Sequence, residues 1–263
     1  MDKLSISDLI ARSVPTKEEF AQMEYNRIHT PTKHALLLQN TLQLSKWLER
    51  CQAAGIKAVP ASFSEDIQIS EIFDRIDGKP SGATLTAAAE WLKTNLRTGY
   101  MWRWEQCAGL ELKSAMAHGQ EVPNQMELDV DDPRLCDILY EVALRTTKLA
   151  IRPIISIQRH KGYPVEFRCY VSGTEQVAVS NYYPQTDLTG FEAQAQQAGE
   201  LALKLYPHVN TGFTADFCMT NGELLFLEGG PPWGAGAHPC CFNPEQVLPG
   251  RIVLKPEPGN MVD

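Results

Sequence analysis

The stretch Glu166-Phe167-Arg168-Cys169-Tyr170-Val171 decides the fold, together with two runs that follow it along the chain. These runs are Thr214-Ala215-Asp216-Phe217 and Leu225-Phe226-Leu227-Glu228-Gly229-Gly230-Pro231. Their aromatic and aliphatic residues are typical of β-strands, yet each run also carries an ionisable residue among apolar neighbours. We therefore expect neighbouring strands that bring the guanidinium of Arg168 close to the carboxylates of Asp216 and Glu228.

A guanidinium beside two carboxylates indicates a site for a magnesium nucleotide. Carboxylate oxygens are hard ligands that suit Mg²⁺, and a guanidinium suits a phosphoryl group that is being transferred. Each residue alone also has an ordinary structural interpretation: a salt-bridged strand residue for Arg168, a solvated face for Asp216 and a strand end for Glu228. Buried charges without partners are costly, so the three together are expected to pair with one another or to hold a metal.

The rest of the chain alternates between helical and strand-like patterns. Apolar residues at helical spacing predict helices over residues 31–54, 84–96, about 133–147 and 191–205, and one around Lys113. Strands are predicted over residues 100–104, 166–171, 176–182, 213–218 and 224–228. Asn221-Gly222 is a strong turn signal that makes the last two strands a hairpin. Mostly antiparallel strands with flanking helices favour the α+β class over a doubly wound sheet.

Composition and charge limit the classes of function. The 263 residues carry a formal net charge of -8 and a sequence pI near 5.3, which argues against bulk electrostatic binding of nucleic acid. No apolar run approaches the ~20 residues of a membrane span, and the first residues do not have the layout of a signal peptide. Seven cysteines without a Cys-x-x-Cys spacing predict a reduced, cytoplasmic protein. We interpret Cys240 and Cys241 as part of a loop rather than as a metal site.

The chain resembles the ATP-grasp superfamily, and more closely its divergent cell-division-cycle-123-like branch and similar phage and bacterial proteins. The run from Glu166 to Val171 and the run Leu227-Glu228-Gly229-Gly230-Pro231-x-Trp-Gly carry this resemblance, which covers about residues 98 to 235. It implies an ATP-grasp-like fold of mostly antiparallel sheets with flanking helices, in which a nucleotide is held between two subdomains.

The resemblance also implies roles for the three charged residues. Asp216 and Glu228 would be the ligands of Mg²⁺, and Arg168 would stabilise the phosphates or an acyl-phosphate transition state. The sequence departs from the family at Gly230, where an Asn usually stands, so one metal ligand is missing. A water or a neighbouring carbonyl can take its place, because Mg²⁺ readily keeps waters.

Five further residues are expected to contact the nucleotide by the same resemblance. Arg103 stands where such proteins carry a phosphate-binding Lys or Arg, and Lys113 is a weaker candidate for which a solvated helix lysine is the alternative. Ile154 belongs to the segment against which adenine would stack, and Arg152 in the same segment would reach the phosphates. Glu166 would bind ribose or the metal shell, or pair with a neighbouring cation.

The resemblance divides the chain into regions with different tasks. Residues 98–263 are expected to bind the nucleotide, with residues 98–160 as a smaller subdomain and residues 161–263 as the sheet that carries the metal. Residues 1–97 are expected to set the specificity for an acceptor or a protein partner, neither of which the sequence identifies.

The leading hypothesis for function is an ATP- and Mg²⁺-dependent ligase that joins a carboxylate to an amine or similar nucleophile through an acyl-phosphate. One alternative is an ATP-binding assembly factor, because the cell-division-cycle-123 branch assembles a translation initiation complex. Another alternative has the charges serve only the stability of the fold. A third is an enzyme that modifies nucleic acid or acts on nucleic-acid ends, using a local basic strip of Arg97, Arg103, Lys148, Arg152, Arg159 and Lys161.

Overall fold

The computed structural model describes residues 22, 25, 26, 28–122, 128–183, 186–232 and 250–255. Cys240 and Cys241 lie outside the described residues, as do the Trp and Gly that end the second family motif. Within the described residues, no helix combines the length and the apolar composition that crossing a bilayer requires.

The larger of two sheets has five strands in the order β11-β10-β8-β9-β12. Neighbouring strands are antiparallel except for β12, which pairs with β9 in parallel. Helix α9 (Glu192–Val209) packs on β8 and β9, and its small residues Ala195, Ala198 and Ala202 are fully buried there. The strands are β8 (Glu166–Val171), β9 (Val177–Asn181), β10 (Phe213–Thr220), β11 (Glu223–Gly230) and β12 (Ile252–Val253).

The smaller sheet has three strands in the order β1-β5-β3, which are β1 (Ser62–Phe63), β5 (Leu149–Pro153) and β3 (Tyr100–Trp104). Its apolar core is shared with helices α3 (Lys33–Thr41), α5 (Ile69–Ile76), α6 (Ala83–Asn95) and α8 (Pro133–Glu141). The other elements are α4 (Leu44–Ala53), α7 (Leu110–His118), the pair β2 (Ile67–Gln68) with β4 (Thr146–Thr147), and the pair β6 (Arg159–His160) with β7 (Tyr163–Pro164).

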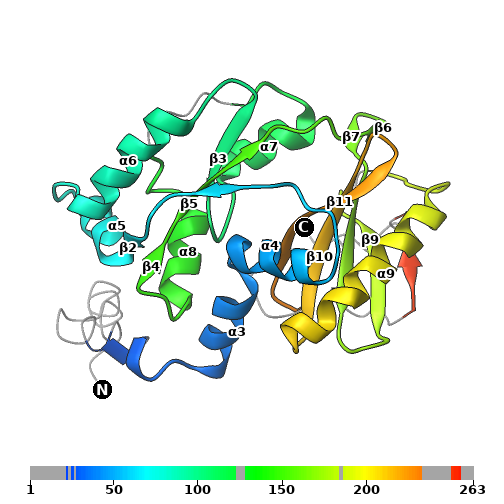
Figure 1. Cartoon of the computed structure of the whole chain (residues 1–263), viewed down its shortest axis with the longest axis horizontal. Helices are drawn as coiled ribbons and strands as arrows, with labels where there is room; N and C mark the ends of the chain where they lie inside the picture. Colours follow the sequence, from blue (N-terminus) through cyan, green and yellow to red (C-terminus); the bar gives the residue numbers. More distant parts are fainter. Residues whose placement is uncertain are drawn as a thin grey trace, which may run out of the picture.

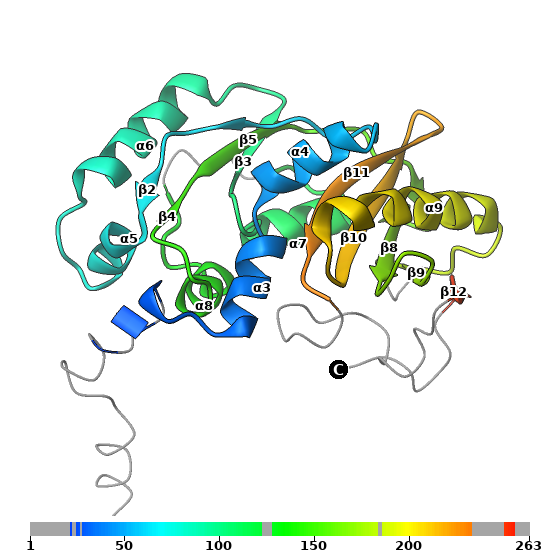
Figure 2. The same ribbon diagram turned by 60° about the horizontal axis from the view of Figure 1, so that its bottom comes forward.

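Two groups of elements therefore lie side by side, each with its own core (Figures 1 and 2). One contains β3 and β5 with α5, α6 and α8, and the other contains β8 to β11 with α9. Helices α3 and α4 lie where the groups meet: Leu38 of α3 belongs to the first core, whereas Trp47 of α4 belongs to the second. The predicted α+β class is confirmed.

Residues before position 98 contribute to both groups. Residues 57–59 run beside the free edge of β11, where Val59 N donates to Phe226 O at 3.0 Å and Phe226 N donates to Lys57 O at 3.0 Å. Strand β1 extends the smaller sheet by pairing with β5. The division of the chain into regions with separate tasks stays a prediction.

Most predicted elements occur, with two corrections. The predicted helix over residues 31–54 is wrong as one element, because Gln43 is extended, with a ψ of 114°, and separates α3 from α4. The Trp47 indole donates to Thr41 O at 2.7 Å, which uses a carbonyl that the break leaves free. The helix from Pro133 ends at Glu141 rather than near Thr147, because Val142 is extended and Thr147 belongs to β4.

Candidate functional site

Arg168, Asp216 and Glu228, on the adjacent strands β8, β10 and β11, share one face of the larger sheet. Asp216 lies opposite Arg168 on β8 and opposite Glu228 on β11. Residues directly opposite each other in a sheet point to the same side. Phe217 pairs with Phe226, so Leu227 is an extra residue that forms a β-bulge next to Glu228. The neighbouring strands expected from the sequence are therefore present, whereas the bulge was not predicted.

Arg168 and Asp216 form a buried two-point ion pair. Nε of Arg168 donates to Oδ1 of Asp216 at 2.8 Å, and Nη2 donates to Oδ2 at 2.6 Å. The two side chains are only 4% and 3% exposed. The guanidinium carbon also lies 4.6 Å from the ring centroid of Tyr182. Burial raises the pKa of Asp216, and the charge of Arg168 opposes that shift. The pair thus keeps a carboxylate in the interior of the site.

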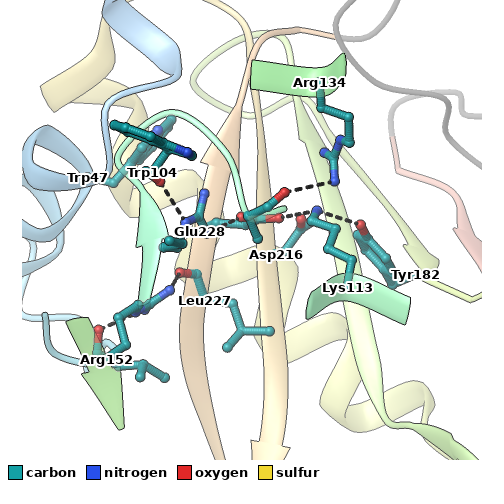
Figure 3. Close-up of polar contacts among 12 residues, drawn as sticks. Trp47, Trp104, Lys113, Arg134, Arg152, Tyr182, Asp216, Leu227 and Glu228 are labelled. Carbon is teal, nitrogen blue, oxygen red and sulfur yellow. Dashed lines mark hydrogen bonds and ion pairs between the residues drawn. The ribbon is translucent and has the colours of Figure 1, made fainter. Parts of the chain in front are cut away.

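Glu228 receives two cations from elements outside the larger sheet. Nη1 of Arg103, on β3, lies 2.6 Å from Oε2, and Nζ of Lys113, on α7, lies 2.8 Å from Oε1. Figure 3 shows Lys113 between Glu228 and the hydroxyl of Tyr182, to which Nζ donates at 3.2 Å. Burial acts to raise the pKa of Glu228, but the two cations hold it well below its usual value. Glu228 therefore stays ionised.

Arg152 ties the smaller sheet to the bulge. Its Nη1 donates to Leu227 O and its Nη2 to Val59 O, both at 2.8 Å, and the side chain lies beside β11 in Figure 3. Nε has no partner within the described residues. Burial, helped by the charge of Arg103, lowers the pKa of Arg152 to about 10. A buried guanidinium with an unused donor is expected to favour an anion nearby.

Glu166 is the least satisfied of the charged groups. It is 6% exposed, and the charges of Lys113 and Arg168 offset its burial only in part. Burial raises its pKa well above the usual value, and the charges of Asp216 and Glu228 add to that shift. The carboxyl therefore favours its protonated form.

A cavity of about 500 Å³, here called the large cavity, lies between the two groups of elements. Five of the predicted site residues line it: Arg103, Lys113, Arg152, Glu166 and Glu228. Much of the remaining wall is apolar and includes Met101, Leu112, Met116 and Leu227. The volume lies in the range of about 300–1,000 Å³ that small-molecule sites occupy.

A second cavity of about 30 Å³, here called the small cavity, adjoins the large one and holds the other two predicted site residues, Arg168 and Asp216. Lys113, Arg134 and Glu228 line both cavities and form their junction. Ile154 lines neither cavity: it is 44% exposed, and its N–H donates to Gly99 O at 2.8 Å. The structure thus brings together every predicted site residue except Ile154, whose role keeps no geometric support.

Two residues at the site were not among the predicted ones. Arg134 reaches the junction from the first turn of α8, and Tyr182, just after β9, contacts both Arg168 and Lys113. Arg134 follows Asp132-Pro133, a helix start with an acidic cap, which gives no sign that the side chain faces a cavity. Of the proposed basic strip, Arg103 and Arg152 are buried in this site, at 6% and 2% exposure.

Asp216 and Glu228 suit a nucleotide-bound Mg²⁺ better than an independent metal site. Among the described residues, no group of three or more His, Cys, Asp or Glu side chains is arranged to hold a metal. Mg²⁺ in nucleotide enzymes typically takes one or two carboxylates and completes its shell with phosphates and water. Two carboxylates opposite each other on β10 and β11 fit that pattern.

Position 230, where the resemblance leads one to expect Asn, leaves little room for a side chain. Gly230 lies opposite Thr214, and a Cβ at position 230 would come 2.7 Å from Thr214 Oγ1. A Cβ at the preceding Gly229 would come 2.1 Å from the indole of Trp47. A side chain at either position requires the side chain of Thr214 or of Trp47 to move.

Comparison with solved structures identifies the fold. The structure is similar to C-terminally truncated Cdc123 from Schizosaccharomyces pombe, with a TM-score of 0.58 and 12% identity over 86% of this chain and 98% of that chain. Cdc123 from Schizosaccharomyces pombe matches with a TM-score of 0.53 and 13% identity, over 82% of this chain and 96% of that chain.

Other comparisons add less. The D-alanine-D-alanine ligase from Helicobacter pylori matches with a TM-score of 0.39 and 16% identity, over 74% of this chain and 52% of that chain, which is too weak to support a conclusion. No protein family model matches the sequence, and no curated protein resembles it in sequence. The predicted resemblance to the cell-division-cycle-123-like branch is confirmed at the level of the fold.

Proposed function

We propose that the protein binds ATP with Mg²⁺ in the large cavity and uses it as an ATP-grasp-type ligase that joins a carboxylate to an amine or similar nucleophile. One observation carries the proposal, the excess of positive charge around the two cavities. Three carboxylates face five cations there, and the pKa of one carboxylate, Glu166, is raised. The cations are Arg103, Lys113, Arg134, Arg152 and Arg168. A polyanion such as a triphosphate would balance them.

The wall of the large cavity suggests how the nucleotide lies. The apolar side chains of Met101, Leu112 and Met116 offer a surface for the base, whereas Arg103 and Arg152 lie beside Glu228 and Leu227 of β11 and suit the phosphates. Asp216 and Glu228 would hold Mg²⁺, which supplies neutralisation of the charge on the phosphates.

The proposed reaction has two steps. A carboxylate oxygen of the acceptor attacks the terminal phosphorus of ATP, the bond from that phosphorus to the bridging oxygen breaks, and ADP leaves. The amine then attacks the acyl carbon of the acyl-phosphate, inorganic phosphate leaves, and the nitrogen loses a proton. Arg168 lies in the small cavity next to Asp216, where it can stabilise the charge of the group in transfer.

The proposal is tested by calorimetric titration and thermal unfolding with Mg²⁺ and ATP. A ligand that binds only the folded protein stabilises it by about 2.7 kcal/mol at a hundredfold excess over its Kd. We expect a magnesium-dependent shift in the wild type that is reduced in Lys113→Gln and in the double variant Asp216→Asn, Glu228→Gln. Lys93→Gln is the matched control, because Lys93 is an exposed lysine of α6 that pairs with Glu90. A wild type that neither binds nor is stabilised by ATP contradicts the proposal.

A second candidate is a nucleotide-dependent assembly factor. The likeness to Cdc123 favours it, because it extends over 98% of the truncated Cdc123 chain. In this case ATP and Mg²⁺ would stabilise a shape that binds a protein, without a ligation product. Release of ADP measured against a panel of carboxylic acids and amines separates the candidates, because only the ligase needs an acceptor for turnover.

A further inference from the structure

We propose that the small cavity is a subsite for an oxyanion and that Arg134 is its principal donor. The inference rests on the proposed function for the identity of the oxyanion, which is either the terminal phosphoryl group of ATP or the carboxylate of the acceptor. Both groups present the same chemistry to a guanidinium, namely negatively charged oxygens in a plane or a tetrahedron.

The cations at the junction of the two cavities differ in how far their donors are already used. Lys113 already binds Glu228 and the hydroxyl of Tyr182. Arg134, in contrast, donates from its side chain only to Ala108 O, at 3.3 Å, among the residues that the structure describes. A guanidinium has five N–H donors, so Arg134 keeps most of its capacity for a ligand. Figure 3 shows its side chain reaching toward the space beside Lys113.

An unpaired donor also lines the small cavity. Gln106 lines the small cavity and is 4% exposed. Its Oε1 accepts a hydrogen bond from Thr147 Oγ1 at 2.5 Å, whereas its Nε2 has no partner within the described part of the chain. A buried amide without a partner is costly, and a ligand oxygen in the cavity would satisfy it.

The small cavity also fits a small anion in size and charge. A volume of about 30 Å³ exceeds the ~10–15 Å³ that one water needs, but it is far below the size of a nucleobase. The two carboxylates on the wall, Asp216 and Glu228, are already held by Arg168, Arg103 and Lys113. The donors of Arg134 and Gln106 thus remain for a small anionic group.

The test is calorimetric titration of the full chain with four probes: Mg·ATP, Mg·ADP, and inorganic phosphate or acetate in the presence of saturating Mg·ADP. Arg134→Gln is compared with Arg75→Gln, a matched control for an exposed arginine on α5. Loss of a charge-assisted contact is expected to weaken binding of one oxyanion about tenfold, while the affinity for Mg·ADP changes less than about twofold.

The titrations distinguish the terminal phosphoryl group of ATP from the carboxylate of the acceptor. Weaker binding of Mg·ATP assigns the subsite to the terminal phosphoryl group, whereas weaker binding of acetate with unchanged Mg·ATP assigns it to the acceptor carboxylate. Unchanged binding of ATP, phosphate and acetate in Arg134→Gln overturns the inference, and so does an equal loss for Mg·ADP.

The inference and the proposed function can fail separately. If the wild type binds neither nucleotide, the proposed function fails, and inorganic phosphate alone then tests the subsite. Phosphate binding that is lost in Arg134→Gln but kept in Arg75→Gln supports the subsite, whereas absence of phosphate binding overturns it as well.

Discussion

Arg168 and Asp216 face each other across β8 and β10, joined by two hydrogen bonds of 2.8 and 2.6 Å in the interior of the larger sheet. Replacing one partner leaves the other as a buried charge without compensation. Arg168→Met is therefore expected to lower the free energy of unfolding by about 3–5 kcal/mol. Urea denaturation followed by circular dichroism measures this change.

The control for this prediction is an exposed pair. Lys57 and Glu223 are 2.7 Å apart, but their side chains are 67% and 59% exposed, so Lys57→Met is expected to cost less than about 1 kcal/mol. The double variant Arg168→Met, Asp216→Leu is expected to recover most of the lost stability, because no unpaired charge remains. An equal cost for Arg168→Met and Lys57→Met would show that the pair does not act as a buried unit.

We predict that the side chain of Thr214, and not a bound metal, restricts position 230 to glycine. A Cβ 2.7 Å from Thr214 Oγ1 forces a shift, so Gly230→Ala is expected to destabilise the protein by about 1–3 kcal/mol. Gly173→Ala is the control, because a Cβ there meets Gln176 at an ordinary 3.5 Å. Thermal and urea unfolding measure both changes.

A rescue variant makes the steric cause testable. Thr214→Ala removes the oxygen that the new Cβ would meet, so Gly230→Ala is expected to cost less in the Thr214→Ala background than in the wild type. Equal costs in the two backgrounds would contradict the steric explanation. Asn at position 230, the usual residue in the family that the chain resembles, would meet the same oxygen.

Local signals in the sequence were enough to predict the strands that carry the site. The hairpin of β10 and β11 follows from Asn221-Gly222, and both residues have the positive φ that such a turn requires, 49° and 79°. The strand pattern also placed Arg168, Asp216 and Glu228 on neighbouring strands, because apolar runs with a single charge are unusual in a core.

The remaining features of the site depend on contacts between distant parts of the chain. Arg103 meets Glu228 across 125 positions of sequence, and Arg152 meets Val59 across 93. No local pattern in the sequence encodes the bulge at Leu227 or the position of Arg134 at the two cavities. The predicted contact of Ile154 with adenine rested on the resemblance alone, and Ile154, just after β5, is 44% exposed and lines neither cavity.

Glu166 is predicted to destabilise the ligand-free protein at neutral pH. Its pKa in the folded protein lies well above the usual 4.5, so below that pH the carboxyl is protonated in both states and costs nothing. As the pH rises through and above 4.5 the unfolded chain ionises first, and the folded protein loses relative stability until its own carboxyl ionises. Glu166→Gln is expected to be more stable than the wild type at pH 7, by a margin that vanishes near pH 4.

Urea denaturation at a series of pH values from 4 to 8 measures this margin, with Glu175→Gln as the exposed control. Glu228 is present in both proteins, and because its pKa is lowered, the stability that it contributes is complete above about 4.5 and falls only at the acidic end of the series. A constant difference between Glu166→Gln and the wild type across the series would contradict the prediction.

Arg152 is predicted to couple the two groups of elements through the two carbonyls that it holds, Val59 O and Leu227 O. A lysine has the charge but cannot reach both oxygens with one planar group. Arg152→Lys is therefore expected to lower the free energy of unfolding by about 1–3 kcal/mol, because a buried carbonyl loses its donor. It is also expected to speed amide hydrogen exchange at Val59 and Phe226, which pair beside these carbonyls.

The control is Arg97→Lys, because Arg97 is exposed and lies over the ring of Tyr100. If Arg152 couples the groups, Arg152→Lys weakens ATP binding together with the faster exchange, since Leu227 and Glu228 then hold their positions less well. Weaker ATP binding with unchanged exchange would instead assign Arg152 a direct contact with the phosphates. Unchanged exchange, stability and affinity would show that the two hydrogen bonds carry no coupling.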